Sequence, residues 1–83
     1  MKRHYKIIES LSKADEAEKF VVYGIEMTEE GNNVSTVKRV LDISADKGFV
    51  GLLTDELSEK DVSAACLLQA IENYISNYMS VYH

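Results

Sequence analysis

The chain has 83 residues, a length that suits one domain rather than two. Apolar residues make up 46% of it and charged residues 28%, a composition that excludes an intrinsically disordered segment. No apolar run approaches the ~18 residues of a membrane-spanning helix. Only Ile7 and Ile8 follow the basic start, too few for a signal peptide. We therefore expect a single domain over residues 1–83, located in the cytoplasm and not bound to membranes.

The net charge of −5 falls in the second half of the chain, where residues 42–83 carry 2 basic and 7 acidic side chains. That half would repel a phosphate backbone, which disfavours nucleic-acid binding. Cys66 is the one cysteine, which excludes a disulfide within the chain. Together with His4 and His83 it is too small a set for a structural zinc site. We expect neither a metal nor a cofactor.

The first half of the chain predicts three strands, at residues 3–11, 19–27 and 34–43. Residues 12–18 are polar and predict a loop or a turn of helix, and residues 28–33 predict a tight turn. In the middle strand Val21, Tyr23, Ile25 and Met27 alternate with the rest, which places odd-numbered side chains in the core. Gly24 within this strand indicates a bulge or a close backbone neighbour.

The third strand alternates as well, and its pattern predicts which of its side chains are buried. Val37, Leu41 and Ile43 share one parity and are expected on the buried side. The open side of the sheet would then carry Val22, Glu26, Thr36, Lys38 and Val40. Short connections predict an antiparallel meander, whose first and third strands are edges available for strand addition.

After Ile43 the period becomes helical, and two helices are predicted, at residues 46–57 and 59–80. Ser44 or Asp46 would cap the first helix. Ser58 would cap the second, with Asp61 in the capping-box position. The fold class is therefore α+β: a three-stranded antiparallel meander over residues 3–43 followed by two helices, the long C-terminal helix packed on one sheet face.

Several short motifs resemble a family of short uncharacterised bacterial proteins, a domain of unknown function. These motifs are Tyr23-Gly24-Ile25 in a strand, an Asp-Ile-Ser-x-Asp turn at residues 42–46, a short helix, Leu57-Ser58, and a final helix to Ile75. The match extends over residues 20–76. The resemblance implies the fold and carries no activity.

Three sets of residues are weighed as catalytic or metal-binding. Cys66 follows Ala65 in the predicted long helix, with no base nearby, and is interpreted as a core or near-core residue. Asp42 and Asp46 could form a small catalytic or cation site, but a strand end and a helix cap explain them as well. The acidic runs lack the spacing of a calcium loop; they are Asp15–Glu18, Glu29–Glu30 and Asp55–Glu56. We expect no enzyme.

The end of the chain supplies the candidate interface. Tyr74, Tyr78, Met79 and Tyr82 recur at helical spacing, and tyrosine suits surfaces that bury a ring while its hydroxyl stays wet. The leading hypothesis is a non-catalytic protein that acts by self-association or by contact with another protein. One alternative is a nucleic-acid-associated regulator that uses the basic residues of the sheet, Lys2, Arg3, Lys6, Lys38 and Arg39. The other is the small enzyme with a site near Asp42 and Asp46.

Overall fold

The computed structural model describes the backbone of residues 2–15 and 18–81, and their side chains except at 12–15, 18–19 and 79–81. Three strands come first: β1 (Lys2–Asp15), β2 (Glu18–Gly31) and β3 (Val34–Ser44). The helix α1 (Lys47–Glu59), the short 3₁₀ helix η1 (Ala64–Cys66) and the helix α2 (Leu67–Val81) follow. The predicted α+β class and the order of its elements are confirmed.

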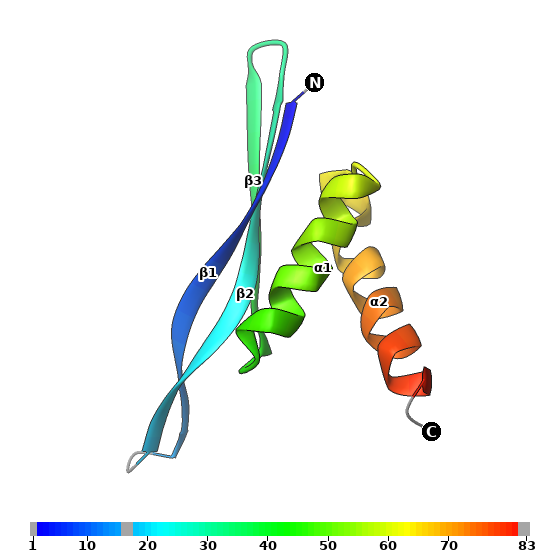
Figure 1. Ribbon diagram of the computed structural model, residues 1–83. Helices are drawn as coiled ribbons and strands as arrows, with labels where there is room; N and C mark the ends of the chain where they lie inside the picture. The colour runs from blue at the N-terminus through cyan, green and yellow to red at the C-terminus, as the bar shows by residue number, and fades with distance from the viewer. Residues whose placement is uncertain (1, 16–17, 82–83) are drawn as a thin grey trace.

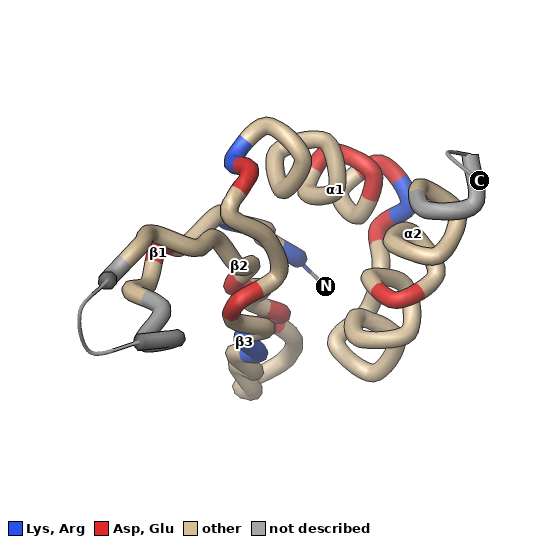
Figure 2. Tube along the Cα trace, turned by 90° about the horizontal axis from the view of Figure 1, so that it is seen from below, with Lys and Arg blue, Asp and Glu red and all other residues tan. Residues whose placement is uncertain are grey.

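The strands form an antiparallel sheet in the order β1-β2-β3, and both helices lie on one side of it (Figures 1 and 2). The two hairpins extend beyond the ends of the helices, so the molecule measures 46 × 32 × 17 Å. Its radius of gyration is 13.9 Å, where a compact domain of this length has about 12 Å. The helices therefore cover only the middle of one face.

The strands are longer than their sequence pattern indicates. Ser12 to Asp15 continue β1, and β2 begins at Glu18, so neither a loop nor a turn of helix occupies the described part of residues 12–18. At the other end β2 runs through residues 28–31, and the turn contains only Asn32 and Asn33. Asn33 has φ 61°, a left-handed conformation that asparagine tolerates.

The core lies between the sheet and the helices. Ile25 and Met27 of β2 are fully buried, as the alternation predicted. Helix α1 contacts all three strands and buries a stripe of side chains, Val50, Leu53 and Leu57. Helix α2 packs mainly against α1 and η1 and adds Leu67 and Ile71 to the same core. The shorter helix thus has the broader contact with the sheet.

The predicted capping box at Ser58 is wrong, because Ser58 belongs to the last turn of α1. That helix ends in a Schellman motif: the N–H of Val62 donates to the carbonyl of Leu57, and the N–H of Asp61 to that of Ser58. Asp61 has φ 50°, the left-handed conformation that this motif requires. The polar residues that suggested the start of a helix therefore end one, and α2 begins only at Leu67.

The predicted faces of β3 are also wrong over most of its length. Val40 pairs with Ile25 and Lys38 with Met27, so both side chains lie on the side of the helices. Thr36 shares this side. Val37 and Leu41 point the other way and are 52% and 54% exposed. Of the side chains predicted for the open side, Glu26 keeps that place by its parity in β2. The predictions for Val21 and Val22 are wrong in burial, since Val22 is only 7% exposed while Val21, predicted in the core, is 39% exposed.

A bulge in β3 explains the error. Tyr23 pairs with Ser44 but Ile25 pairs with Val40, so Gly24 faces three residues of β3. Asp42 within the bulge has φ 55°. A Cβ on Gly24 would lie 2.3 Å from the carbonyl oxygen of Val40, which confirms the close backbone neighbour expected there. Because of the bulge, Val40 and Ile43 both pack against the core although their parities differ.

Candidate functional site

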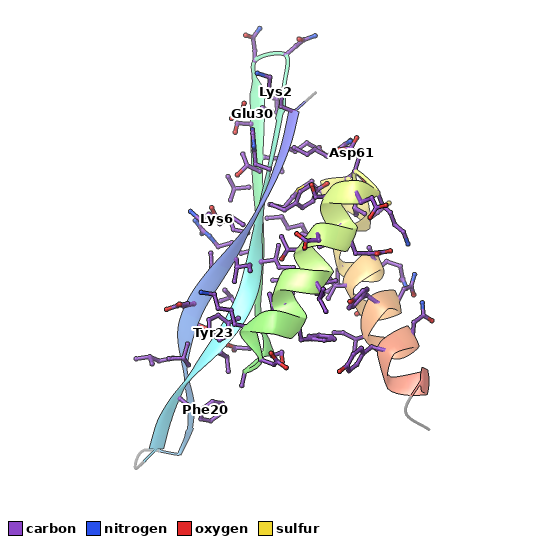
Figure 3. The ribbon with its side chains drawn as sticks, viewed as in Figure 1. Lys2, Lys6, Phe20, Tyr23, Glu30 and Asp61 are labelled. Atoms are coloured by element: carbon purple, nitrogen blue, oxygen red, sulfur yellow. The ribbon has the colours of Figure 1, made fainter. Side chains whose placement is uncertain are left out.

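Polar side chains of the sheet hold the segment that joins the two helices, residues 60–66, which we call the connector. The Arg3 guanidinium lies 2.7 Å from the carboxylate of Asp61, which Figure 3 shows on the helix side of the sheet. The Tyr5 hydroxyl donates to the carbonyl of Val62. The Lys38 ammonium donates to the carbonyl of Ala64 at 3.1 Å. Three strand residues thus bind the connector through its oxygen atoms.

Glu29 completes this arrangement from the neighbouring position on β2. Its carboxylate accepts from the Arg3 guanidinium at 2.8 Å and from the backbone N–H of Ala64 at 3.2 Å. The hydrogen bond from Arg3, followed by that from Ala64, lowers the pKa of Glu29 from its ordinary 4.5. Burial raises the pKa of the Tyr5 hydroxyl. These groups are engaged in holding the fold.

Sequence reasoning missed this role, although a signal was present. Arg3 and Glu29 have the parity of the buried residues Ile25 and Met27, and charged side chains on a buried parity need partners. Both side chains bind backbone atoms of the connector. A pattern of side chains in the sequence does not reveal such a backbone partner.

Neither of the described helices α1 and α2 lies on the opposite face of the sheet, which we call the open face. A charged row crosses it: Glu26 lies between Arg39 at 2.6 Å and Lys6 at 3.7 Å. The hydrogen bond from Arg39 lowers the pKa of Glu26. Figure 3 shows Lys6 on the side of the sheet away from the helices. By register and parity the open face also includes Ile8, Thr28, Val37 and Leu41, together with Val22, which is only 7% exposed.

Two of the four predicted interface residues, Tyr74 and Tyr78, have described side chains. Tyr74 is half-buried and Tyr78 is exposed, and both rings contact Phe49 of α1, with centroids 5.7 and 4.8 Å from it. The side chain of Met79 and the whole of Tyr82 lie outside the described residues. An open pocket of about 250 Å³ lies beside Tyr78, lined also by Ile43, Ser44, Asp46, Phe49 and Ile75. Tyr74 therefore serves the helix–helix packing, while Tyr78 borders a surface.

Asp42 and Asp46 each have a separate structural partner. Asp42 accepts a hydrogen bond from the hydroxyl of Ser10 on β1 at 3.1 Å. Asp46 caps α1 by accepting from the N–H of Phe49 at 3.2 Å, which confirms one of the two predicted caps. Within residues 2–15 and 18–81 no three metal-ligating side chains gather into a group. The geometry brings no catalytic pair together here.

The prediction for Cys66 is wrong, since its thiol is exposed. The core positions of this region belong to Leu67 and Ile71, and Cys66 ends η1 on the outer side. The physical reason is the later start of α2, which changes the face that each residue presents.

The basic residues of the sheet do not form one surface. Arg3 and Lys38 lie on the helix side, where they bind the connector. Lys6 and Arg39 lie on the open face, where both flank Glu26. In the described part of the chain, no helix has the length and apolar character needed to cross a membrane.

Comparison with known proteins supplies a family and no activity. The chain matches the family of unknown function DUF6514 over residues 1–77. It belongs to that family. This agrees with the resemblance to short uncharacterised proteins that the motifs indicated. No curated protein and no solved structure matches the chain. The functional argument for this DUF6514 member therefore depends on its own geometry.

Proposed function

We propose that this protein is non-catalytic and works by contact with another protein molecule, through the side of the sheet that the helices leave uncovered. The observation that carries the proposal is the one-sided layering: both helices lie on one face, while Val37 and Leu41 on the other are more than half exposed. An uncovered sheet face that carries exposed apolar side chains beside charged ones is typical of a protein–protein interface.

The amount of exposed surface supports the same proposal. The chain exposes 5897 Å², where a compact monomer of its mass exposes about 5000 Å². The excess, about 900 Å², is close to the area of about 800 Å² that one partner buries in an ordinary protein interface. The exposed thiol of Cys66 suits the reducing cytoplasm, where we place the protein.

Site-specific photo-crosslinking tests the proposal. A photoreactive amino acid is placed at Leu41 on the open face or, as a matched control, at Leu52 on the outer side of α1, which is 61% exposed. Under illumination in the native cell, we expect a discrete crosslinked protein band from position 41 and none from position 52. Equal crosslinking from the two positions, or none from position 41, would contradict the assignment.

A further inference from the structure

The outer edge of β3 is unpaired within the described sheet. β3 is the last strand in the order, so the backbone groups on its outer side have no neighbouring strand. Residues 34–37 are all exposed, and Val34 and Val37 are 64% and 52% exposed. The β2–β3 hairpin reaches beyond the helices, so no described helix runs alongside this end of the edge (Figure 1).

The two cations of β3 do not guard the edge, although lysine and arginine often do so. Lys38 turns to the helix side and donates to the carbonyl of Ala64 at 3.1 Å. Arg39 turns to the neighbouring strand and binds Glu26 at 2.6 Å. On the opposite edge Lys6 of β1 binds the same Glu26 at 3.7 Å, and its side chain is 67% exposed, close to the 61% of Arg39. An extended, β-branched edge from Val34 to Val37 is therefore left available for pairing.

We propose that the β3 strands of two copies of this chain pair antiparallel, edge to edge, with Val37 facing Val37 of the second copy. This inference goes beyond the proposed function, because the contact runs along the outer edge of β3 and leaves the open face uncovered. The result is a six-stranded antiparallel sheet. Because antiparallel strands of one sheet are related by a two-fold axis normal to it, both helix layers lie on the same side of that sheet.

The register follows from geometry and charge. The turn at Asn33 and the bulge at Asp42 limit the regular part of β3 to residues 34–40, whose midpoint is Val37. Pairing about this midpoint places Val34 opposite Val40 of the second copy, so apolar side chains meet apolar ones. Lys38 faces Thr36, and Arg39 faces Ser35. Pairing centred on Lys38 would instead set like charges directly opposite each other, which is unfavourable.

The backbone chemistry suits such a contact. In strand addition the main-chain hydrogen bonds supply the affinity and the side-chain pairs supply the register. The exposed valines would lose contact with water in the dimer, which reduces the excess surface of the chain.

Charge substitution at the two-fold axis tests the inference. The full-length chain is compared with Val37→Asp and Val37→Lys by sedimentation velocity over a range of chain concentrations. We expect the unaltered chain to dimerise and each variant alone to show a dissociation constant raised at least about tenfold, because like charges face each other. An equimolar mixture of the two variants should restore dimers, since Asp then faces Lys. Only an interface in which position 37 meets itself gives this rescue.

Matched controls separate the edge from the rest of the surface. Leu52→Asp and Leu52→Lys place the same charges on α1 and should leave the dimer unchanged. Circular dichroism of each variant checks the fold, which a change at the exposed Val37 should not disturb. In a Cys66→Ser background, Val37→Cys should form a disulfide-linked dimer under mild oxidation, because directly opposed strand residues lie within disulfide range. Leu52→Cys in that background should not.

The outcomes distinguish this inference from the proposed function. A chain that stays monomeric at all concentrations overturns the β3 pairing, whereas the crosslinking from Leu41 decides the proposed function separately. A dimer that both Val37 variants leave intact also overturns the pairing, and then another surface joins the copies.

Discussion

The two faces of this sheet use charged residues in different ways. On the helix side, Arg3, Glu29 and Lys38 bind backbone atoms of the connector, so each charge fixes one element against another. On the open face, Lys6, Glu26 and Arg39 bind one another across neighbouring strands. The first set positions the helices, while the second leaves a neutralised row on an exposed surface. The difference shows which face serves the fold and which is left for contact.

Truncating one apolar side chain on each face should give the largest difference in the free energy of unfolding. Ile25→Ala creates a cavity on the helix side, and we expect the free energy of unfolding to fall by about 2–5 kcal/mol, enough to unfold much of a small domain. Val37→Ala on the exposed side should change it by less than about 0.5 kcal/mol. Urea unfolding at one low chain concentration measures both. Similar losses would mean that the open face is buried in solution.

Gly24 of β2 lies opposite the bulge of β3. Adding one methyl group at this position tests the close approach of the two strands. Gly24→Ala would place its Cβ 2.3 Å from the Val40 carbonyl oxygen, so we expect a loss of about 1–3 kcal/mol. Gly51→Ala in α1 meets only the end of Ile7, at 3.9 Å. There a gain of about 0.5–1 kcal/mol is expected, since alanine favours the helix. Thermal unfolding compares the two, and an unchanged Gly24→Ala variant would contradict the bulge geometry.

Features that arise from local pattern were predicted well from the sequence. The order of strands and helices, the buried Ile25 and Met27, the cap at Asp46 and the close approach at Gly24 all come from periodicity and residue chemistry. These features depend on neighbours in the chain, which is why a single sequence contains them.

The errors occur where a distant contact overrides the local pattern. Ser58 and Asp61 look like a capping box, but the strand residue Arg3 binds Asp61 where α1 ends. The parity of β3 fails because the bulge at Asp42 adds residues that no alternation reveals. The candidate surface on the open face depends on the same bulge. Because of it, Val37 and Leu41 face outward, rather than Lys38 and Val40. The sequence did place Glu26 on the open side of the sheet, and it named Tyr78, which borders a pocket.

The smallest expected effect is the loss of stability at acidic pH. Glu26 on the open face and Glu29 on the helix side both contribute to it. Glu26 and Glu29 both have a pKa below the ordinary 4.5, chiefly because of hydrogen bonds from Arg39 and Arg3. A lowered pKa means that the unfolded chain binds the proton more tightly, so this stabilisation is complete above about pH 4.5 and is lost as the pH falls through the folded pKa. We expect the urea midpoint to be steady near neutral pH and to drop below that range.

Single substitutions measure how much each of these two glutamates contributes to the loss of stability in acid. Glu29→Gln should lower the midpoint at neutral pH more than Glu26→Gln, because Glu29 also accepts from the backbone N–H of Ala64 and so holds the connector. Each variant should also show a shallower decline below about pH 4.5 than the parent, since one titrating group has been removed. Measurement of the urea midpoint against pH for the three chains checks both statements. If Glu26→Gln proved the more damaging, the charged row of the open face would hold the fold, and its availability to a partner would have to be abandoned.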